Sequence, residues 1–501
     1  MLPVSSCVQA VSSIIKLCLP SVGSCLLRIV NTSLRTGIIP DSWKVSIIHP
    51  VPKASNSRDL TNFRPISIVP TIAKIVERVV QEQLFSYFND NHLFNVSQHG
   101  FRAQHSTETA LLCLTDKVCQ AMDSGHIALL VMLDLSKCFD VVDHARLLDK
   151  LRLYGVCTRW FDSYLTNHSQ RVALSSRSAG RRLSRALPNP LGTYQGSALG
   201  PLLYSVYSND MPLYVEDADI IQYADDTQVL VTGSKHNMSQ NIMKMERSLA
   251  DLSWWFRKNA MKLNAQKTQL IVFGTRQNLK LLPPVSVKLD NVSIFESQTV
   301  KNLGVIFDRH LSFDSHIDYV VRRCTGMLLA LSHTKHGLPP EVLPRLIDGL
   351  VMSAIRYCVS VYGATSGQLT RRVQGCMNFC ARVLSGKRKF DHISGTLRSL
   401  GWLSAGQLHQ YCTVMALRRL TDSSEPEALT ELFMRNGEVH TRTTRSSSLF
   451  HLPRIRNEYG RRRFAYRAAA LVNALPCHVR EGHGSRRAFG AALRGHMLGT
   501  T

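Results

Sequence analysis

The chain has 501 residues, and its 60 Lys and Arg residues outnumber its 36 Asp and Glu residues, which gives a formal net charge of +24. A hydrophobic share of 44% is ample for packed cores, the length predicts roughly three domains, and the positive charge suits a partner with a phosphate backbone. The 13 cysteines include no CxxC pair, which argues against a zinc finger, and we expect them to be reduced.

Residues 1–31 are rich in apolar residues at near-helical spacing, but Lys16, Pro20 and Arg28 interrupt the run. We predict a pair of helices that is too interrupted to span a membrane, and no basic segment of a secretory signal precedes it. We therefore expect an intracellular protein, nuclear and/or cytoplasmic, without a membrane partner. Residues 72–88 and 107–122 show the periodicity of amphipathic helices.

A nearly continuous apolar run over residues 126–133 predicts a strand buried on both faces, and it ends at Asp134. An acid at the end of a buried strand is costly unless it is paired or binds a metal. The alternative is that Asp134 only caps the following turn. Further on, residues 195–201 form a glycine-bearing loop that leads into a predicted helix over 199–209. Such a loop lets the backbone approach a nucleotide closely.

The string Tyr223-Ala224-Asp225-Asp226 lies between two apolar, β-rich runs, which predicts a β-hairpin with the acid pair at its tip. Adjacent carboxylates at a strand turn can bind Mg²⁺, although an acid pair also occurs in ordinary turns. Asp134 is far upstream, so only the tertiary fold can bring the three acids together. Two Mg²⁺ ions about 4 Å apart in such a cluster would stabilise both oxygens of a phosphoryl transfer.

The later part of the chain predicts a helix over 237–259, a strand over 270–273, a strand and turn over 300–308, and mainly helices beyond. From residue 441 onwards there are twelve arginines, no lysine and two acids. Within this region Arg461, Arg462 and Arg463 adjoin Phe464 and Tyr466. The two rings could stack on unpaired bases or pack into a core.

Motifs along nearly the whole chain occur in the order found in one family of polymerases. They lie at residues 37–44, 62–67, 98–102, 106–108, 134–144, 195–196, 225–226, 263–268, 303–305, 452–456 and 464–476. The chain resembles the reverse transcriptases of LINE-type (non-LTR) retrotransposons, in particular the jockey-like RNA-directed DNA polymerases. The resemblance implies an α+β right-hand polymerase with fingers, a palm with an antiparallel sheet, a helical thumb and a basic C-terminal extension.

The resemblance also implies domain boundaries. We expect an N-terminal extension and fingers over 1–125, a palm over 126–310, a helical thumb or connection over 311–425 and an arginine-rich domain over 426–501. In complete elements of this kind an endonuclease domain precedes the polymerase, and we expect it to be absent here.

By resemblance, Asp134, Asp225 and Asp226 are the catalytic residues. Together with the carbonyl of Leu135 they would hold two Mg²⁺ ions, with Mn²⁺ as a substitute. The implied reaction extends a DNA 3′-hydroxyl on an RNA template, so the implied partners are template RNA, a DNA primer and dNTPs.

The remaining implied roles fall into three sets. The predicted dNTP-binding residues are Lys53, Arg64, Phe139, Gln195, Gly196 and Lys267, where Phe139 would crowd a ribose 2′-hydroxyl. The predicted primer grip is Leu303 and Gly304. The predicted nucleic-acid-binding residues are Arg102, Arg461, Arg462 and Arg463. Without the motif around them, Phe139 would be a core aromatic residue, and Arg64 and Lys267 would be solvated cations.

One position departs from the family pattern: Tyr194 stands where a proline usually precedes the Gln195 loop. Three alternative functions stay open. The chain could be an inactive, truncated relic that binds RNA, or a maturase-like RNA-binding protein. An RNA-dependent RNA polymerase is disfavoured by Phe139.

Overall fold

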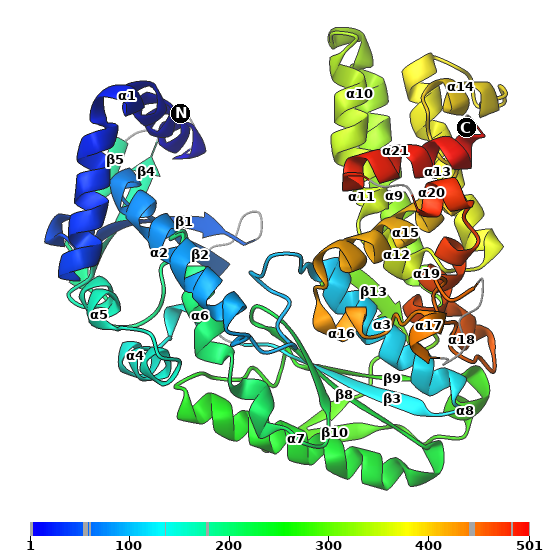
Figure 1. Cartoon of the computed structure of the whole chain (residues 1–501), viewed down its shortest axis with the longest axis horizontal. Coiled ribbons are helices and arrows are strands. Elements are labelled where there is room, and N and C mark those ends of the chain that lie inside the picture. The colour runs from blue at the N-terminus through cyan, green and yellow to red at the C-terminus, as the bar shows by residue number, and fades with distance from the viewer. Residues whose placement is uncertain are drawn as a thin grey trace. The chain divides into compact units, whose positions relative to one another are not determined.

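The structure is a computed structural model, and it describes residues 4–53, 59, 62–135, 137–176, 180–439, 446–481 and 484–499. These residues form helices and sheets in the predicted α+β class (Figure 1). Their contacts divide the chain into two compact units, each of which contains separate stretches of sequence. Unit 1 consists of Met1–Phe101, Leu135–Tyr214 and Asp251–Asn264, and unit 2 consists of Arg102–Asp134, Val215–Ala250 and Ala265–Thr501.

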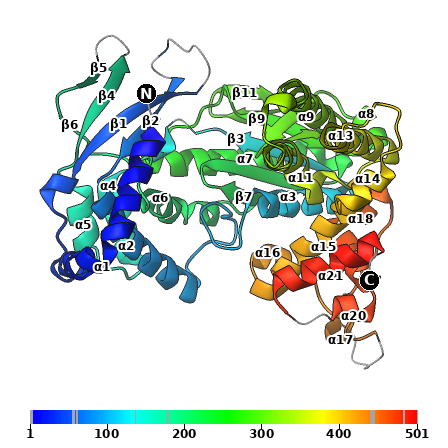
Figure 2. The ribbon, with the colours of Figure 1, turned by 90° about the horizontal axis from the view of Figure 1, so that it is seen from above.

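Unit 1 contains a five-stranded sheet and its surrounding helices. The strands are β1 (Val45–Pro52), β2 (Phe63–Ile68), β4 (Ser169–Ser176), β5 (Gly180–Leu183) and β6 (Leu187–Pro188). The order is β2-β1-β4-β5 with β6 also paired to β4, and the strands lie side by side in Figure 2. The helices are α1 (Val4–Thr36), α2 (Thr71–Asp90), α4 (His144–Leu153), α5 (Arg159–Leu165) and α6 (Gly200–Ser208), with short 3-10 turns at Asp41–Trp43, Cys138–Asp140 and Met211–Tyr214.

The N-terminal helix differs from the prediction. A single helix, α1, runs through Pro20, so the predicted pair of helices is wrong. A proline removes one backbone hydrogen bond, but the residues on both sides of it continue the helix. Within the described residues, Ile14–Thr36 is the stretch whose length and mean hydropathy of 1.5 suit a membrane span, and 6% of it is buried. Soluble core helices and N-terminal signals share these properties, so the absence of a membrane partner stays a prediction.

Unit 2 contains a four-stranded antiparallel sheet in the order β7-β8-β3-β9. Its strands are β3 (Ile127–Leu133), β7 (Asp219–Tyr223), β8 (Asp226–Gly233) and β9 (Gln269–Phe273). Helix α3 (Thr107–Asp123) shares a buried core with Leu130 and Ile271 of this sheet. Helix α7 (Met238–Lys258), whose last turns belong to unit 1, runs along the sheet (Figure 1). The sheet agrees with the predicted antiparallel palm.

Two β-hairpins and a series of helices complete unit 2. The hairpins are β10 (Ser286–Leu289) with β11 (Val292–Phe295), and β12 (Thr299–Asn302) with β13 (Val305–Asp308). The longer helices are α9 (Asp314–Thr334), α13 (Gly367–Ser385), α15 (Ala405–Ser423), α19 (Phe464–Asn473) and α21 (Arg486–Leu498). The shorter ones are α8 (Arg276–Lys280), α10 (Val342–Leu346), α11 (Ser353–Arg356), α12 (Val359–Tyr362), α14 (Ser394–Ser399), α16 (Glu427–Thr430), α17 (Asn436–Val439), α18 (Glu458–Arg462) and α20 (Cys477–Arg480), with a π-helical turn at Ile347–Met352 and 3-10 turns at Lys235–Asn237 and Lys335–Gly337.

A continuous core joins the C-terminal helices of unit 2 to α3 and the sheet. It contains side chains from α9, α13, α15 and α19, such as Leu328, Met377, Leu417 and Phe464. Phe464 is 1% exposed, so its ring packs in the core rather than facing solvent. The predicted boundaries of the four consecutive domains stay a prediction.

Candidate active site

The acid pair lies on the predicted hairpin in unit 2. Tyr223, the last residue of β7, pairs with Asp226, the first residue of β8, so that Ala224 and Asp225 form a two-residue turn. Ala224 has a φ of 57°, and a positive φ at the first turn position alone is the pattern of a type II′ hairpin turn. The hairpin prediction is therefore confirmed, with Asp225 in the turn and Asp226 at the start of the strand.

Strand register brings charged residues from three distant segments to one edge of the sheet. Leu133 at the end of β3 pairs with Thr227 of β8, and extending this register by one pair sets Asp134 opposite Asp226. On the other side of β3, Gln269 at the start of β9 pairs with Met132, and Lys267 lies in the turn two residues before Gln269. The three predicted catalytic acids and Lys267 therefore share one end of the same antiparallel sheet.

These carboxylates affect one another electrostatically. Loss of surrounding water, followed by the negative charges of Asp225 and Asp134, raises the pKa of Asp226 to about 6. The Asp226 side chain still reaches solvent, whereas Asp134 and Asp225 are half-buried. Close negative charges repel one another, and a divalent cation relieves that repulsion.

The donor chemistry at this edge suits a hard cation, because Mg²⁺ and Mn²⁺ prefer carboxylate oxygens. Within the described part of the chain, no group of three His, Cys, Asp or Glu side chains is arranged to hold a metal ion. Leu135, the predicted carbonyl ligand, follows Asp134 directly and forms an isolated antiparallel bridge with Leu263. The acids thus fit a metal in chemistry, without forming a closed coordination shell.

The predicted primer grip is a second hairpin turn of unit 2. Leu303 and Gly304, at φ of 43° and 86°, connect β12 to β13, and two positive φ values are typical of a type I′ turn. The Tyr357 hydroxyl donates to the Leu303 carbonyl at 2.6 Å. Gln228 of β8 donates from Nε2 to Asn302 Oδ1 at 3.1 Å, which ties this hairpin to the strand that begins with Asp226.

Three of the predicted nucleotide-binding residues lie together in unit 1. Gln195 donates from Nε2 to Asp140 Oδ1 at 2.8 Å, and the backbone N–H of Thr193 donates to the Phe139 carbonyl at 2.7 Å. The half-buried Phe139 ring lies 4.5 Å from the Tyr204 ring, measured between centroids. These hydrogen bonds join the turn that carries Phe139 to the loop that contains Gln195 and the next residue, Gly196.

The two predicted phosphate-binding cations lie on the β1–β2 hairpin of unit 1. Val51 pairs with Arg64, so Lys53, two residues further along, lies on the same face as Arg64. Both cations are exposed. Burial raises the pKa of Asp140, and the positive charge of Lys53 is one of the influences that oppose this rise. Lys53 is therefore electrostatically coupled to the turn that carries Phe139.

Sequence reasoning missed a buried acid beneath the loop. Glu77 of α2 is 2% exposed, and its carboxylate accepts hydrogen bonds from Tyr164 and from the backbone of Ala198. One signal could have found it. Glu77 falls within the apolar stripe of a predicted amphipathic helix, between Val76 and Val80, where an acid needs a partner.

Most of the predicted nucleic-acid-binding arginines bind the protein itself. Arg463 is buried and pairs with Asp116 of α3 at 2.9 Å, a correction to its predicted role. Arg462 donates to the Leu311 carbonyl. The side chain of Arg102 is 8% exposed and lies 3.6 Å from Glu425. These arginines neutralise or cap groups of unit 2, and sequence alone could not identify partners so far away along the chain.

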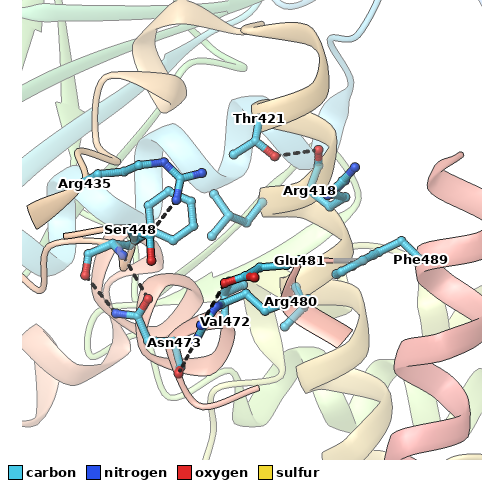
Figure 3. Close-up of a pocket in the computed structure, with 12 residues that line it drawn as sticks. Arg418, Thr421, Arg435, Ser448, Val472, Asn473, Arg480, Glu481 and Phe489 are labelled. Atoms are coloured by element: carbon cyan, nitrogen blue, oxygen red, sulfur yellow. Dashed lines mark hydrogen bonds and ion pairs between the residues drawn. The ribbon is translucent and has the colours of Figure 1, made fainter. Parts of the chain in front are cut away.

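Arg461 is the member of the set that stays exposed, at 3.8 Å from Glu458 on the same short helix. Three other arginines of unit 2 line a pocket of about 240 Å³ between α15, α19 and α21 (Figure 3). Arg418 pairs with Asp422 at 2.8 Å, Arg435 donates to the Ser448 carbonyl, and Arg480 lies 3.3 Å from Glu481. The contact from Arg435 to Ser448 joins two C-terminal segments, whereas the other two contacts are local.

Comparison with known proteins identifies the class to which this fold and site belong. Residues 51–307, just over half of the chain, match the family described as reverse transcriptase (RNA-dependent DNA polymerase). The matched region contains the whole four-stranded sheet, the acid pair and the Gln195 loop. The chain belongs to the reverse transcriptase family.

Similar curated proteins are encoded by mobile elements. The chain is 31% identical over 381 residues to the probable RNA-directed DNA polymerase from transposon BS of Drosophila melanogaster. It is 31% identical over 378 residues to the RNA-directed DNA polymerase from mobile element jockey of the same fly. Each match covers 72% of this chain and 40% of the relative, so the chain spans well under half the length of these relatives.

Among solved structures, similar chains include telomerases of yeasts. Apo telomerase from Candida tropicalis, truncated from its C-terminal domain, shares 12% identity at a TM-score of 0.37, over 54% of each chain. Telomerase from Candida albicans shares 12% identity at a TM-score of 0.35, over 79% of this chain and 67% of that one. Likeness at this level adds nothing to the family assignment.

Proposed function

We propose that this chain extends a DNA 3′-hydroxyl on an RNA template, as a polymerase of a non-LTR retrotransposon. The observation that carries the proposal is the edge of the unit 2 sheet, where register sets Asp134 opposite Asp226 and the turn adds Asp225. Membership of the reverse transcriptase family supports it, as do relatives named as RNA-directed DNA polymerases.

The acids at this edge would hold two Mg²⁺ ions through Asp134 and Asp225, with Asp226 and the Leu135 carbonyl in support. When bound, such ions make the primer hydroxyl a better nucleophile and stabilise the departing pyrophosphate. Burial, and then the negative charges of Asp225 and Asp134, raise the pKa of Asp226, and the contribution of these charges supports this role because the same carboxylates attract a cation.

The other predicted residues would bind and select the nucleotide. Lys53 and Arg64 would bind the triphosphate from the exposed face of their hairpin, and Lys267 would donate a proton to pyrophosphate. Phe139 would exclude a ribose 2′-hydroxyl by steric clash, and Gln195 would contact the nascent base pair. The contacts that join Phe139 to the Gln195 loop support a shared nucleotide surface.

The test is primer extension on an RNA template with labelled dNTPs and Mg²⁺, in the parent chain and in Asp225→Asn. Incorporation by the parent chain that the variant lacks supports the proposal. Phe139→Ala should then raise the incorporation of ribonucleotides relative to deoxynucleotides. An inactive parent chain that still binds RNA would instead identify a relic or maturase-like binder, and preferential use of ribonucleotides by the parent would identify an RNA polymerase.

We further propose that the chain acts inside the cell, in the nucleus or cytoplasm, with RNA and DNA as its partners. The surplus of basic residues supports binding to phosphate backbones. Binding of the parent chain to RNA should weaken steeply between low and moderate salt, and a flat salt dependence would contradict this proposal.

A further inference from the structure

A buried carboxylate in unit 1 contacts the segment that follows the Gln195–Gly196 loop. The carboxylate of Glu77 accepts a hydrogen bond from the Tyr164 hydroxyl at 2.9 Å and another from the backbone N–H of Ala198 at 2.7 Å. Tyr164, on α5, is also buried. Glu77 thus joins α2 and α5 to residues far along the chain, at the N-terminal approach to α6.

The hydrogen bonds around Glu77 have a single consistent direction. Ser197 Oγ accepts from the backbone N–H groups of Leu199 and Gly200, at 3.0 and 2.9 Å, which uses both acceptor positions of the hydroxyl. The Ser197 proton must therefore be donated, and the Tyr164 hydroxyl oxygen lies 3.1 Å away. Tyr164 in turn donates its own proton to Glu77. Hydrogen bonds that run in one direction polarise and strengthen one another.

Three successive backbone N–H groups, of residues 198–200, thus depend on one network that ends at Glu77. These are donors at the start of α6, where N–H groups lack partners within the helix. On the other side of the loop, the Ser67 N–H donates to the Gln195 carbonyl at 2.7 Å. Gly196 lies so close to β2, the strand of Ser67, that an added Cβ would be 2.4 Å from the Ser67 carbonyl oxygen. The loop is therefore held from both sides.

We propose that Glu77 and Tyr164 are positioning residues that hold the Gln195–Gly196 loop in the conformation used for nucleotide binding. The effect on nucleotide binding rests on the proposed polymerase function, whereas the effect on the loop itself does not. The contribution of both residues acts through Ser197, Ala198 and the start of α6.

The same network shows how the chain accommodates Tyr194, where the resembling family has proline. Tyr194 lines a small internal cavity of about 20 Å³ together with Glu77, Tyr164 and His168. Its ring lies 4.7 Å from the His168 ring, between centroids, and burial raises the pKa of its hydroxyl. Packing of this ring restrains the approach to Gln195, which a proline would restrain through its backbone.

Replacing Glu77 with Gln tests the network with almost no change in volume. A carboxylate can accept from both Tyr164 and Ala198, but an amide offers one oxygen, so its NH₂ group must face one of these two donors. Hydrogen exchange by mass spectrometry should then show at least about tenfold faster exchange of the amides at 198–200 in Glu77→Gln. Unchanged protection of these amides would overturn the proposal, whether or not the chain is a polymerase.

The matched control is Asp123→Asn. Asp123 is also a buried carboxylate that accepts two backbone hydrogen bonds, from Arg456 and Asn457 at 2.9 and 2.8 Å, and it belongs to unit 2. Both bonds end on Oδ1, which an amide can retain, so this variant removes a buried charge without losing an acceptor and should leave the amides at 198–200 unchanged. Faster exchange at 198–200 in both variants would mean that any loss of buried charge loosens the chain, which would also overturn the proposal.

Primer extension supplies the readout that a merely structural role would not change. Glu77→Gln should raise the KM for dNTP about tenfold, with a much smaller change in kcat and in the melting temperature. Tyr164→Phe should act in the same direction, and the double variant should be no worse than Glu77→Gln alone, because both changes break one network. A loss of stability with unchanged KM would contradict the positioning role. An inactive parent chain would refute the polymerase function instead and leave the exchange result to decide.

Discussion

The Asp225 hairpin of unit 2 and the Gln195 loop of unit 1 hold their functional residues by different means. Strand pairing positions the hairpin, since Tyr223 pairs with Asp226 and the neighbouring strand continues the register to Asp134. Buried side chains from other elements position the loop, above all Glu77. The hairpin should therefore tolerate changes of individual side chains without moving, whereas single distant substitutions should displace the loop.

The largest effect is expected from a substitution that removes a carboxylate charge from the Asp225 hairpin and keeps the backbone geometry of the hairpin. Asp225→Asn should lower primer extension by at least about a thousandfold, because several kcal/mol of charge stabilisation depend on this group. The midpoint of thermal unfolding should stay unchanged, since main-chain pairing holds the turn. Asp290→Asn, in the turn between β10 and β11, is the control and should remain active. Full activity of Asp225→Asn would contradict the metal role.

Lowering the pH should reduce the stability of the two units to different extents. Burial lowers the pKa of His316 to about 4 and that of His409 to about 3 in unit 2. His105 of unit 2 and His168 of unit 1 also have pKa values lowered to about 4, mainly by burial. These pKa values lie below that of an unfolded histidine, about 6.5. As the pH falls below about 6.5, the unfolded chain therefore binds protons that the folded chain does not.

The free energy of unfolding should therefore fall by up to about 1.4 kcal/mol per pH unit for each such histidine between pH 6.5 and 4. Urea denaturation at pH 7 and pH 5 measures this loss of unfolding free energy. Proteolytic fragments assigned to each unit show which unit is destabilised. Unit 2 should lose more stability than unit 1. His409→Gln can still accept from Arg467 and should reduce the loss in unit 2. Equal loss in parent and variant would show that the pKa of His409 is not lowered in the folded chain.

A glycine pair tests how tightly the loop is confined. Gly196 has a φ of 124° and would place a Cβ against Ser67, whereas Gly180 of the same unit has a φ of 66° and nothing within 4 Å of an added Cβ. Gly196→Ala should cost about 1–3 kcal/mol in loop strain and raise the KM for dNTP roughly 10- to 100-fold. Gly180→Ala should have little effect on KM. Similar kinetics for both variants would contradict a closely held loop.

The smallest effect is expected from Tyr357, whose side chain supports the β12–β13 hairpin of unit 2. Tyr357→Phe removes the hydrogen bond to the Leu303 carbonyl, which is worth about 1 kcal/mol. Affinity for a primer–template duplex, measured by fluorescence anisotropy, should weaken about fivefold if this turn contacts the primer. Tyr362→Phe, which removes a buried hydroxyl bonded to Ile355, serves as control. Equal affinity in the parent chain and in Tyr357→Phe would contradict the assignment of the primer grip to this turn.

Sequence predicted the local elements of both regions well. The Asp225 hairpin, the strand that ends at Asp134 and the helix after the Gln195 loop all occur as expected, because period, turn residues and glycine act over a few residues. The exception was α1. Pro20 predicts a break between two helices, yet one interrupted hydrogen bond does not end a helix whose flanks both continue.

Partners at long range could not be predicted. Arg463 belongs to a basic run that suggests a phosphate partner, yet it pairs with Asp116, 347 residues earlier. Glu77 was missed for the same reason, since its partners Tyr164 and Ala198 lie 87 and 121 residues further on. No local pattern states which acid and which donor a fold will bury together.

By itself, the sequence determined the α+β class, the order of the motifs and the family, because these depend on short patterns and their succession. The tertiary structure determined which charged residues lie close together and which of them are buried. It set Asp134 opposite Asp226 through strand register, buried Arg463 against α3, and placed Glu77 beneath the Gln195 loop. The physical reason is the cost of burying a charge without a partner, which only the packing of distant segments can relieve.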